Sequence, residues 1–238
     1  MNTNHDISVK SFCDLYAILK DFRGGGSVYR GQKNISYKLI PSIGRVEQYS
    51  PNSEKRLFED FKKRLPAYDG YVPVNDWERL ALAQHYELPT RLLDWSENPL
   101  VAAFFASRAT SSNKLLESDG AIYILSLTEK VDEAIETPFD VSEVKRFRPS
   151  FFIKRMYAQR GLFTIHPEPT VPLKLGEDSA AHTRITRIII DKSFKAQLRW
   201  DLHRFGIDES TLFPDLTGMT RFLKWRTEDP EPWMEQFK

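Results

Sequence analysis

Apolar residues recur every three or four positions along several segments of the chain, which is the spacing of one face of an α-helix. Ser11, followed three residues later by Asp14, resembles a capping box at the start of the first of these segments, and a second helix is predicted from Ser53. Asn75 and Asn98 are suitable N-caps for two further helices. The predicted helices cover 12–22, 53–65, 75–84, 98–105, a segment after Ser193, and 214–225.

Short runs rich in β-branched residues predict the strands. The clearest are "AIYILSL" at 121–127 and "RITRIIID" at 184–191, whereas "RGLFTIH" at 160–166 and "SVYRG" at 27–31 are shorter. The segment 90–95 is also predicted to be extended, since a proline disfavours helix in the residue before it. Because most helices precede most strands, the order predicts an α+β fold. We expect a single domain over residues 1–238, with a mixed or antiparallel sheet flanked by helices.

The composition limits the kinds of partner. The 238 residues suffice for one sizeable core, and 34 basic against 33 acidic residues give a net charge of +1, so bulk charge indicates no nucleic-acid or membrane partner. No run approaches the ~18 apolar residues of a membrane span, and no basic segment leads into an apolar one near the N-terminus. The chain is therefore expected to be soluble and cytoplasmic. Its single cysteine, Cys13, lies in a helical pattern and is expected to be buried and unreactive.

The densest group of polar side chains lies in "QHYELPTRLLDWS" at 84–96, directly before the apolar helix "NPLVAAFFA". Each residue has a structural explanation: Asp94 and Ser96 suit the free N–H groups of that helix, Arg91 suits an ion pair with Asp94, and Trp95 suits the core. Their density favours a ligand site, because a helix N-terminus beside a Ser and an Arg is a natural seat for phosphate. The stretch also supplies Gln84 and His85.

Signatures of metal and hydrolase sites are missing from the sequence. One cysteine and five histidines without paired spacing give no zinc or haem pattern. There is no Gly-x-Ser-x-Gly elbow or P-loop, and the glycines of "RGGGS" at 23–27 are interpreted as a helix C-cap and hinge. No metal is therefore expected in the site.

Five segments together resemble the FRG domain family, which is named for an aromatic-Arg-Gly motif. They are "SVYRGQ", "YKLIPSIGR", "LALAQHYELPTRLLDWSENPLVAAFFA", "YAQRGLFTIHP" and "GIDESTLFPDLTGM", and the motif itself is Tyr29-Arg30-Gly31. The resemblance runs from about the first helix to the last one, with Tyr in place of Phe before Arg30. Gly31 allows another backbone or a ligand to approach closely. The resemblance implies one FRG-like domain with its site around this motif and the polar stretch at 84–96.

A second resemblance indicates a reaction. A strand with Tyr-Arg-Gly, a Ser at the end of an extended segment and a late acidic residue are similar in order to the Arg-Ser-Glu class of ADP-ribosyltransferases. This similarity implies an ADP-ribosyltransferase-like fold in which Arg30 holds the phosphate of NAD and Ser96 orders the nicotinamide-bearing ribose. Glu209 would be the acid, although it lacks the paired Glu/Gln-x-Glu spacing of the class, and Gln159 is its rival.

The first functional hypothesis is therefore an NAD-dependent ADP-ribosyltransferase or NAD hydrolase, with NAD as co-substrate and a nucleic acid or protein as acceptor. A toxin or an antiviral effector is the candidate role, with an antitoxin as a candidate partner. Tyr29 and Trp95 are candidates to stack on nicotinamide or adenine, although an aromatic beside an apolar helix is more often core. Ser96 and Glu209 are expected to matter for the reaction more than for stability. The residues predicted to line one cleft are Arg30, Gln84, His85, Arg91, Asp94 and Ser96.

The alternative is a non-catalytic module that binds a phosphorylated ligand or a nucleic acid. A segment that mixes basic and aromatic residues supports it, since such side chains hold nucleic-acid backbone and base respectively. The simpler interpretation is a solvated helix face backed by core residues. The segment contains Arg146, Phe147, Phe151, Phe152, Lys154, Arg155, Tyr157 and Arg160.

Overall fold

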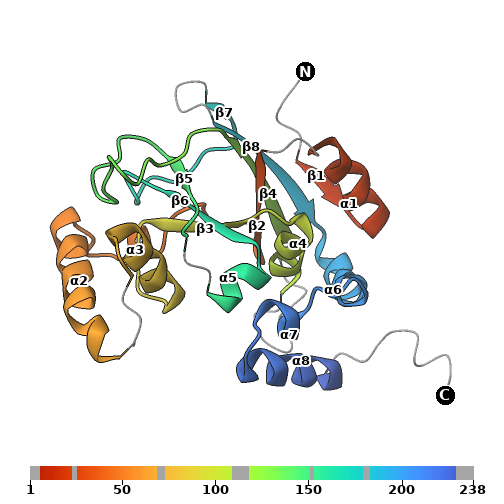
Figure 1. Ribbon diagram of the computed structural model, residues 1–238. Helices are drawn as coiled ribbons and strands as arrows, with labels where there is room; N and C mark the ends of the chain where they lie inside the picture. The colour runs from red at the N-terminus through yellow and green to blue at the C-terminus, as the bar shows by residue number, and fades with distance from the viewer. Residues whose placement is uncertain are drawn as a thin grey trace, which may run out of the picture.

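The computed structural model describes residues 6–22, 26–68, 73–108, 118–150, 153–178 and 183–228. It confirms the predicted α+β class in a single domain: within these residues one mixed sheet of eight strands is flanked by helices (Figure 1). The strands follow the order β1-β8-β4-β2-β3-β6-β5, with β7 beside β8. β1 and β8 run parallel, and the other paired strands are antiparallel.

The strands correspond well to the runs that predicted them. Those at 27–31, 121–127, 160–166 and 184–191 become β2, β4, β6 and β8, and the extended segment 90–95 contains β3. β1, β5 and β7 were not predicted, because three residues are too few for a pattern to show. The bounds are β1 (Ile7–Val9), β2 (Ser27–Gln32), β3 (Leu92–Ser96), β4 (Gly120–Leu127), β5 (Lys145–Phe147), β6 (Gly161–Ile165), β7 (Gly176–Asp178) and β8 (Thr183–Ile190).

The helices begin at polar caps. Ser11, Asn75 and Asn98 each accept a hydrogen bond from a main-chain N–H of the first turn, as their positions in the sequence predicted. The second helix begins earlier than predicted, because Ser50 is its N-cap and Ser53 completes the capping box. The α-helices are α1 (Phe12–Leu19), α2 (Pro51–Arg64), α3 (Asp76–His85), α4 (Pro99–Ser107), α5 (Lys154–Ala158), α6 (Lys195–Arg204), α7 (Glu209–Leu212) and α8 (Leu216–Glu228). Short 3₁₀ helices cover Lys20–Phe22, Ile43–Arg45, Leu65–Ala67 and Lys192–Phe194.

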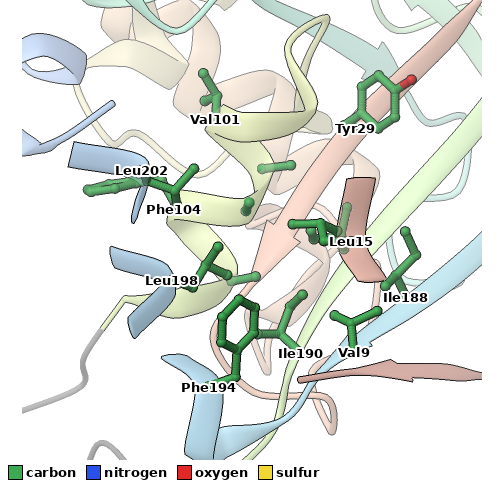
Figure 2. Close-up of a cluster of buried hydrophobic side chains, with 14 of the residues drawn as sticks. Val9, Leu15, Tyr29, Val101, Phe104, Ile188, Ile190, Phe194, Leu198 and Leu202 are labelled. Carbon is green, nitrogen blue, oxygen red and sulfur yellow. The ribbon is translucent and has the colours of Figure 1, made fainter. Parts of the chain in front are cut away.

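Two groups of helices cover one face of the sheet. α1, α4 and α6 pack on β2, β4 and β8, and Figure 2 shows Phe104 of α4 and Leu198 of α6 in this cluster. α2, α3 and α5 pack over β3, β5 and β6. Tyr29, which contacts the first group, lies opposite Ser96 in the ladder between β2 and β3. Leu92, which contacts the second group, points to the same side of β3 as Ser96, because side chains four residues apart on a strand share a face. Both groups of helices therefore cover the same face of the sheet. The other face is covered by connecting segments that contribute Leu39 and Leu173.

Cys13 is exposed rather than buried, because it lies on the solvent side of α1 while Leu15 faces the core. Over the described ranges, none of the helices combines the length and the apolar character needed to span a bilayer.

Candidate functional site

A cleft opens on the helix-covered face of the sheet. It consists of two cavities, with volumes of about 200 Å³ between β2, β3 and α4, and about 280 Å³ between α3, β3 and α5. Asp94, Arg155 and Gln159 border both cavities, so the two lie side by side. In Figure 1, α5, the helix that carries Arg155, lies between α3 and α4. Of the residues predicted to converge here, the structure brings together Arg30, Gln84, His85, Asp94 and Ser96.

Arg30 spans a gap in the sheet. The ladder between β2 and β3 is confined to Tyr29 opposite Ser96, whereas β2 pairs with β4 along its whole length. Nη1 of Arg30 donates a 2.7 Å hydrogen bond to the main-chain oxygen of Asp94, beyond that single pair. The guanidinium thus replaces a missing ladder bond. Burial lowers the pKa of Arg30, and the Asp94 carboxylate, whose Oδ2 lies 3.6 Å from Nη1, partly offsets this effect.

Gly31 allows α4 to pack directly on β2. A Cβ atom at this position would lie 1.8 Å from the main-chain oxygen of Ala102 and 2.7 Å from the main-chain nitrogen of Ala106. The close approach expected at this glycine is therefore that of another backbone. It brings Val101, Ala102 and Phe105 of α4 to the wall of the first cavity.

Asp94 is the acidic residue at the junction of the two cavities. Its side chain is 56% exposed and accepts a 2.9 Å hydrogen bond from Nε2 of Gln84. Oε1 of Gln84 in turn accepts a 2.7 Å hydrogen bond from Oγ1 of Thr90, which fixes the orientation of the amide. The carboxylate is therefore held by Gln84 and by Arg30 while it remains open to the cleft.

Ser96 has a stronger structural role than expected. Its Oγ donates a 2.7 Å hydrogen bond to the main-chain oxygen of Gln159 and accepts one of 3.0 Å from the main-chain nitrogen of Asn98. The side chain thus joins the end of β3 to the segment after α5 and to the start of α4. Because both contacts hold main-chain groups, Ser96 shapes the cleft that it borders.

The two aromatic candidates are core residues that also belong to the border of the first cavity. Trp95 is 3% exposed, and its indole N–H donates a 2.9 Å hydrogen bond to Oγ1 of Thr164. Tyr29 is 6% exposed, and its hydroxyl donates a 3.1 Å hydrogen bond to the main-chain oxygen of Phe22. The core interpretation of both residues is confirmed.

Arg155 is a cleft residue that sequence reasoning assigned only to the basic segment. It lies on α5 and borders both cavities together with Gln159, whose Nε2 donates a 3.1 Å hydrogen bond to the main-chain oxygen of Leu212. The spacing of four residues between Arg155 and Gln159 places them on one side of a helical turn. The spacing alone could therefore have predicted that the side chains of Arg155 and Gln159 lie at the same site.

His85 ends α3 and borders the second cavity. Burial lowers its pKa, and the positive charge of Arg155 lowers it further. The imidazole is therefore neutral at neutral pH, with one nitrogen able to donate a hydrogen bond and the other able to accept one.

Arg91 lies outside the cleft, contrary to the prediction. It is buried, and its Nε and Nη2 donate hydrogen bonds of 2.8 and 2.6 Å to the two carboxylate oxygens of Glu54 on α2. The predicted pairing of Arg91 with Asp94 is also wrong. A buried carboxylate offers a guanidinium two parallel charge-assisted bonds, whereas Asp94 is exposed and already accepts from Gln84.

Glu209 does not border either cavity. It is 6% exposed at the start of α7, and its Oε1 lies 3.2 Å from Nε of Arg108. The small polar residues beside Glu209 in the sequence favour a solvated side chain. This expectation is wrong, because Asp208 takes the N-cap position and places Glu209 in the packed first turn of α7. Its assignment as the acid of the site therefore finds no support in the geometry.

The basic and aromatic segment does not form one surface. Phe147 is fully buried against Trp77 and Phe163, and Nη1 of Arg146 donates to the main-chain oxygen of Gly26. Arg155 borders the cleft. Lys154, Tyr157 and Arg160 are exposed, whereas Phe151 and Phe152 lie outside the described residues.

The cleft offers both charged and neutral hydrogen-bonding groups. Within the part of the chain that the structure describes, no three His, Cys, Asp or Glu side chains gather in a metal-binding arrangement. The polar side chains at its border include Asp94, Gln84, Gln159, His85, Arg30 and Arg155. A carboxylate and a cation bordering the same cavities suit a ligand that carries both phosphate and a group on which positive charge develops.

Comparisons with known proteins find one matching family model. The model of the FRG domain matches residues 25–114, which is less than half of the chain and shorter than the resemblance seen in the sequence. The matched segment contains the Tyr29-Arg30-Gly31 motif and the polar stretch at 84–96, while Arg155 and Gln159 lie beyond it. No curated protein and no solved structure matches the chain, so the similarity to ADP-ribosyltransferases gains no support there. Residues 25–114 are therefore similar to the FRG domain family.

Proposed function

We propose that the cleft binds NAD or a related nucleotide and that the protein breaks its N-glycosidic bond, transferring ADP-ribose to an acceptor or to water. The observation that supports this is the carboxylate of Asp94, which borders both cavities and is oriented by Gln84 and Arg30. Cleavage of the nicotinamide–ribose bond develops positive charge on the ribose. A preorganised carboxylate facing that charge lowers the energy of the transition state.

The reaction needs little acid or base catalysis. The bond from ribose C1′ to the nicotinamide nitrogen breaks with its electron pair on nitrogen, so nicotinamide leaves as a neutral molecule. Water or an acceptor nucleophile forms the new bond to C1′ and releases one proton. The protein contributes by holding the substrate with C1′ beside Asp94, in the orientation that the reaction requires.

The roles implied by the resemblance change accordingly. Asp94 replaces Glu209 as the acid of the site, because it is the carboxylate shared by both cavities. Arg30 orients Asp94 and fixes β3, since its Nη1 is already bonded to the main chain. Arg155, which borders the cavity, is the cation that would hold the phosphate. Ser96 positions the main chain of Gln159 through its hydrogen bond to the main-chain oxygen of that residue.

The test is the release of nicotinamide from NAD by the purified protein and its Asp94→Asn variant. The variant keeps the size of the side chain and removes its charge, so it should fold normally and lose turnover by on the order of a hundredfold or more. Glu97→Gln is the matched control, since Glu97 follows β3 and pairs at the surface with Arg148. Unchanged turnover in Asp94→Asn contradicts the assignment. Absence of NAD turnover by the parent with nucleic acid and lysate protein present contradicts the enzyme hypothesis.

The cellular role proposed is that of a cytoplasmic toxin or antiviral effector whose acceptor is a nucleic acid or a protein. Expression of the parent should then arrest bacterial growth, and Asp94→Asn should relieve the arrest at equal protein level. Equal growth of cells that express the two proteins contradicts this role.

One observation favours the second candidate, a non-catalytic module for a phosphorylated ligand. Arg30 and Ser96, to which the resemblance gives catalytic roles, both donate to main-chain oxygens, of Asp94 and Gln159 respectively, so both of these hydrogen bonds are structural. Salt-sensitive binding of ADP-ribose or an oligonucleotide, with NAD left intact, supports this candidate over the enzyme.

A further inference from the structure

Two arginines contact one phenylalanine ring beside the cleft. The Cζ atom of Arg155 lies 4.6 Å from the ring centre of Phe213, and that of Arg108 lies 5.4 Å from the same centre. Phe213 is 5% exposed and directly follows α7, whereas Arg108 follows α4 and Arg155 lies on α5. Three separate elements therefore place two cations on one buried ring.

The cluster has an excess of positive charge. Arg108 has a carboxylate partner in Glu209, with 3.2 Å between Nε and Oε1. No carboxylate of a described residue lies within 4.0 Å of the guanidinium of Arg155. The arrangement therefore leaves one net positive charge at the border of the cleft.

The cluster adjoins the first cavity, although Arg108 itself does not border it. Arg155 borders that cavity, and so does Phe105, whose ring centre lies 6.2 Å from that of Phe213 and 5.9 Å from Cζ of Arg108. A guanidinium that lies over an aromatic ring keeps the N–H groups in its own plane available for other acceptors. Two guanidinium groups gathered at one ring supply several N–H donors for the oxygens of linked phosphates.

We infer that Arg108 and Arg155, oriented by Phe213, form a pyrophosphate-binding site at the α4 end of the cleft. The inference rests on the proposed function, because it names the part of the nucleotide that this end of the cleft holds. Asp94 borders the same cavity as Arg155, so the pyrophosphate and the reacting ribose of one ligand are held by neighbouring walls. Glu209 is a positioning residue, since it orients Arg108 and does not border either cavity.

The test is calorimetric titration with ADP and with adenosine, neither of which requires turnover. The parent should bind ADP more tightly than adenosine, and Arg155→Gln should weaken ADP binding about tenfold or more while adenosine binding is unchanged. Arg108→Gln alone would leave Glu209 buried without its partner, so the double variant Arg108→Gln/Glu209→Gln is used, with the same expected loss. Arg226→Gln is the matched control, because Arg226 lies 5.9 Å from the ring centre of Phe222 on α8, outside the cleft.

The possible outcomes separate this inference from the proposed function. No preference of the parent for ADP over adenosine, or unchanged ADP affinity in both cleft variants, overturns the pyrophosphate site. If Arg155→Gln weakens ADP binding only as much as Arg226→Gln does, the pyrophosphate site is also overturned, because the loss would then follow from the change in net charge. If ADP binding depends on the two arginines while NAD remains intact, the phosphate site stands and the glycosidic reaction does not.

Discussion

Nη1 of Arg30 donates a 2.7 Å hydrogen bond to the main-chain oxygen of Asp94, at the place where β2 and β3 no longer pair. The same guanidinium lies 3.6 Å from the Asp94 carboxylate. Arg30 therefore couples the opening of the sheet to the position of the acid that borders the cleft. The arginine of the Tyr29-Arg30-Gly31 motif is at once part of the sheet and part of the site.

Replacement of Arg30 by lysine should destabilise the protein and impair the cleft. An ammonium cannot keep the planar contact with both the main-chain oxygen and the carboxylate of Asp94, so we expect a loss of about 1–3 kcal/mol in the free energy of unfolding. Denaturant unfolding of Arg30→Lys beside Arg148→Lys, a change in an exposed ion pair, measures the difference. Equal stability of the two variants would show that the bridge to Asp94 is dispensable.

Replacement of Gly31 by alanine should be among the most damaging single changes. The new methyl group would lie 1.8 Å from the main-chain oxygen of Ala102, so α4 must move away from β2. We expect a loss on the order of 3 kcal/mol or more, or failure to fold. Gly26→Ala is the control, because no atom lies within 4 Å of the added Cβ. Similar melting temperatures for the two variants would contradict the close packing of α4.

Replacement of Glu209 by glutamine should lower stability. The carboxylate is buried and pairs with Arg108, whose side chain is 32% exposed, so water compensates part of the lost ion pair and we expect a loss of about 1 kcal/mol. Thermal melts of Glu209→Gln and of Glu228→Gln, which affects an exposed pair with Lys224, provide the comparison. A parent-like melt combined with hundredfold slower NAD turnover would instead restore Glu209 as the catalytic acid.

Stability should fall in mild acid because of His166. Burial, together with the positive charges of Arg30 and Arg91, lowers the pKa of His166 from 6.5 to about 3. Between these two pH values the unfolded chain binds a proton that the folded protein excludes, so the free energy of unfolding decreases as the pH falls from 6.5 toward 3. The decrease should be on the order of a few kcal/mol, and His166→Gln should remove this part of the pH dependence. Parallel stability curves for the two proteins would contradict the buried neutral imidazole.

The local structure could be predicted from the sequence because its causes lie within a few residues. Ser11, Asn75 and Asn98 cap helices through main-chain groups of the next turn, and the β-branched runs at 121–127 and 184–191 become the central strands β4 and β8. The requirement for a glycine at 31 was also visible in the sequence. These features follow from backbone geometry and from the period of apolar residues.

The composition of the cleft was decided by tertiary structure. Arg91 and Asp94 are three residues apart, yet Arg91 pairs with Glu54 on α2 and Asp94 is held by Arg30 on β2, and neither partner is close in sequence. The same holds for Glu209, which is buried because Arg108 and the turn that Asp208 caps enclose it. The sequence determined which polar groups are present, because the chemistry of a side chain depends only on the type of its residue. Only the packing of distant elements selected which of them face the cleft, because burial and charge pairing depend on neighbours that the fold supplies.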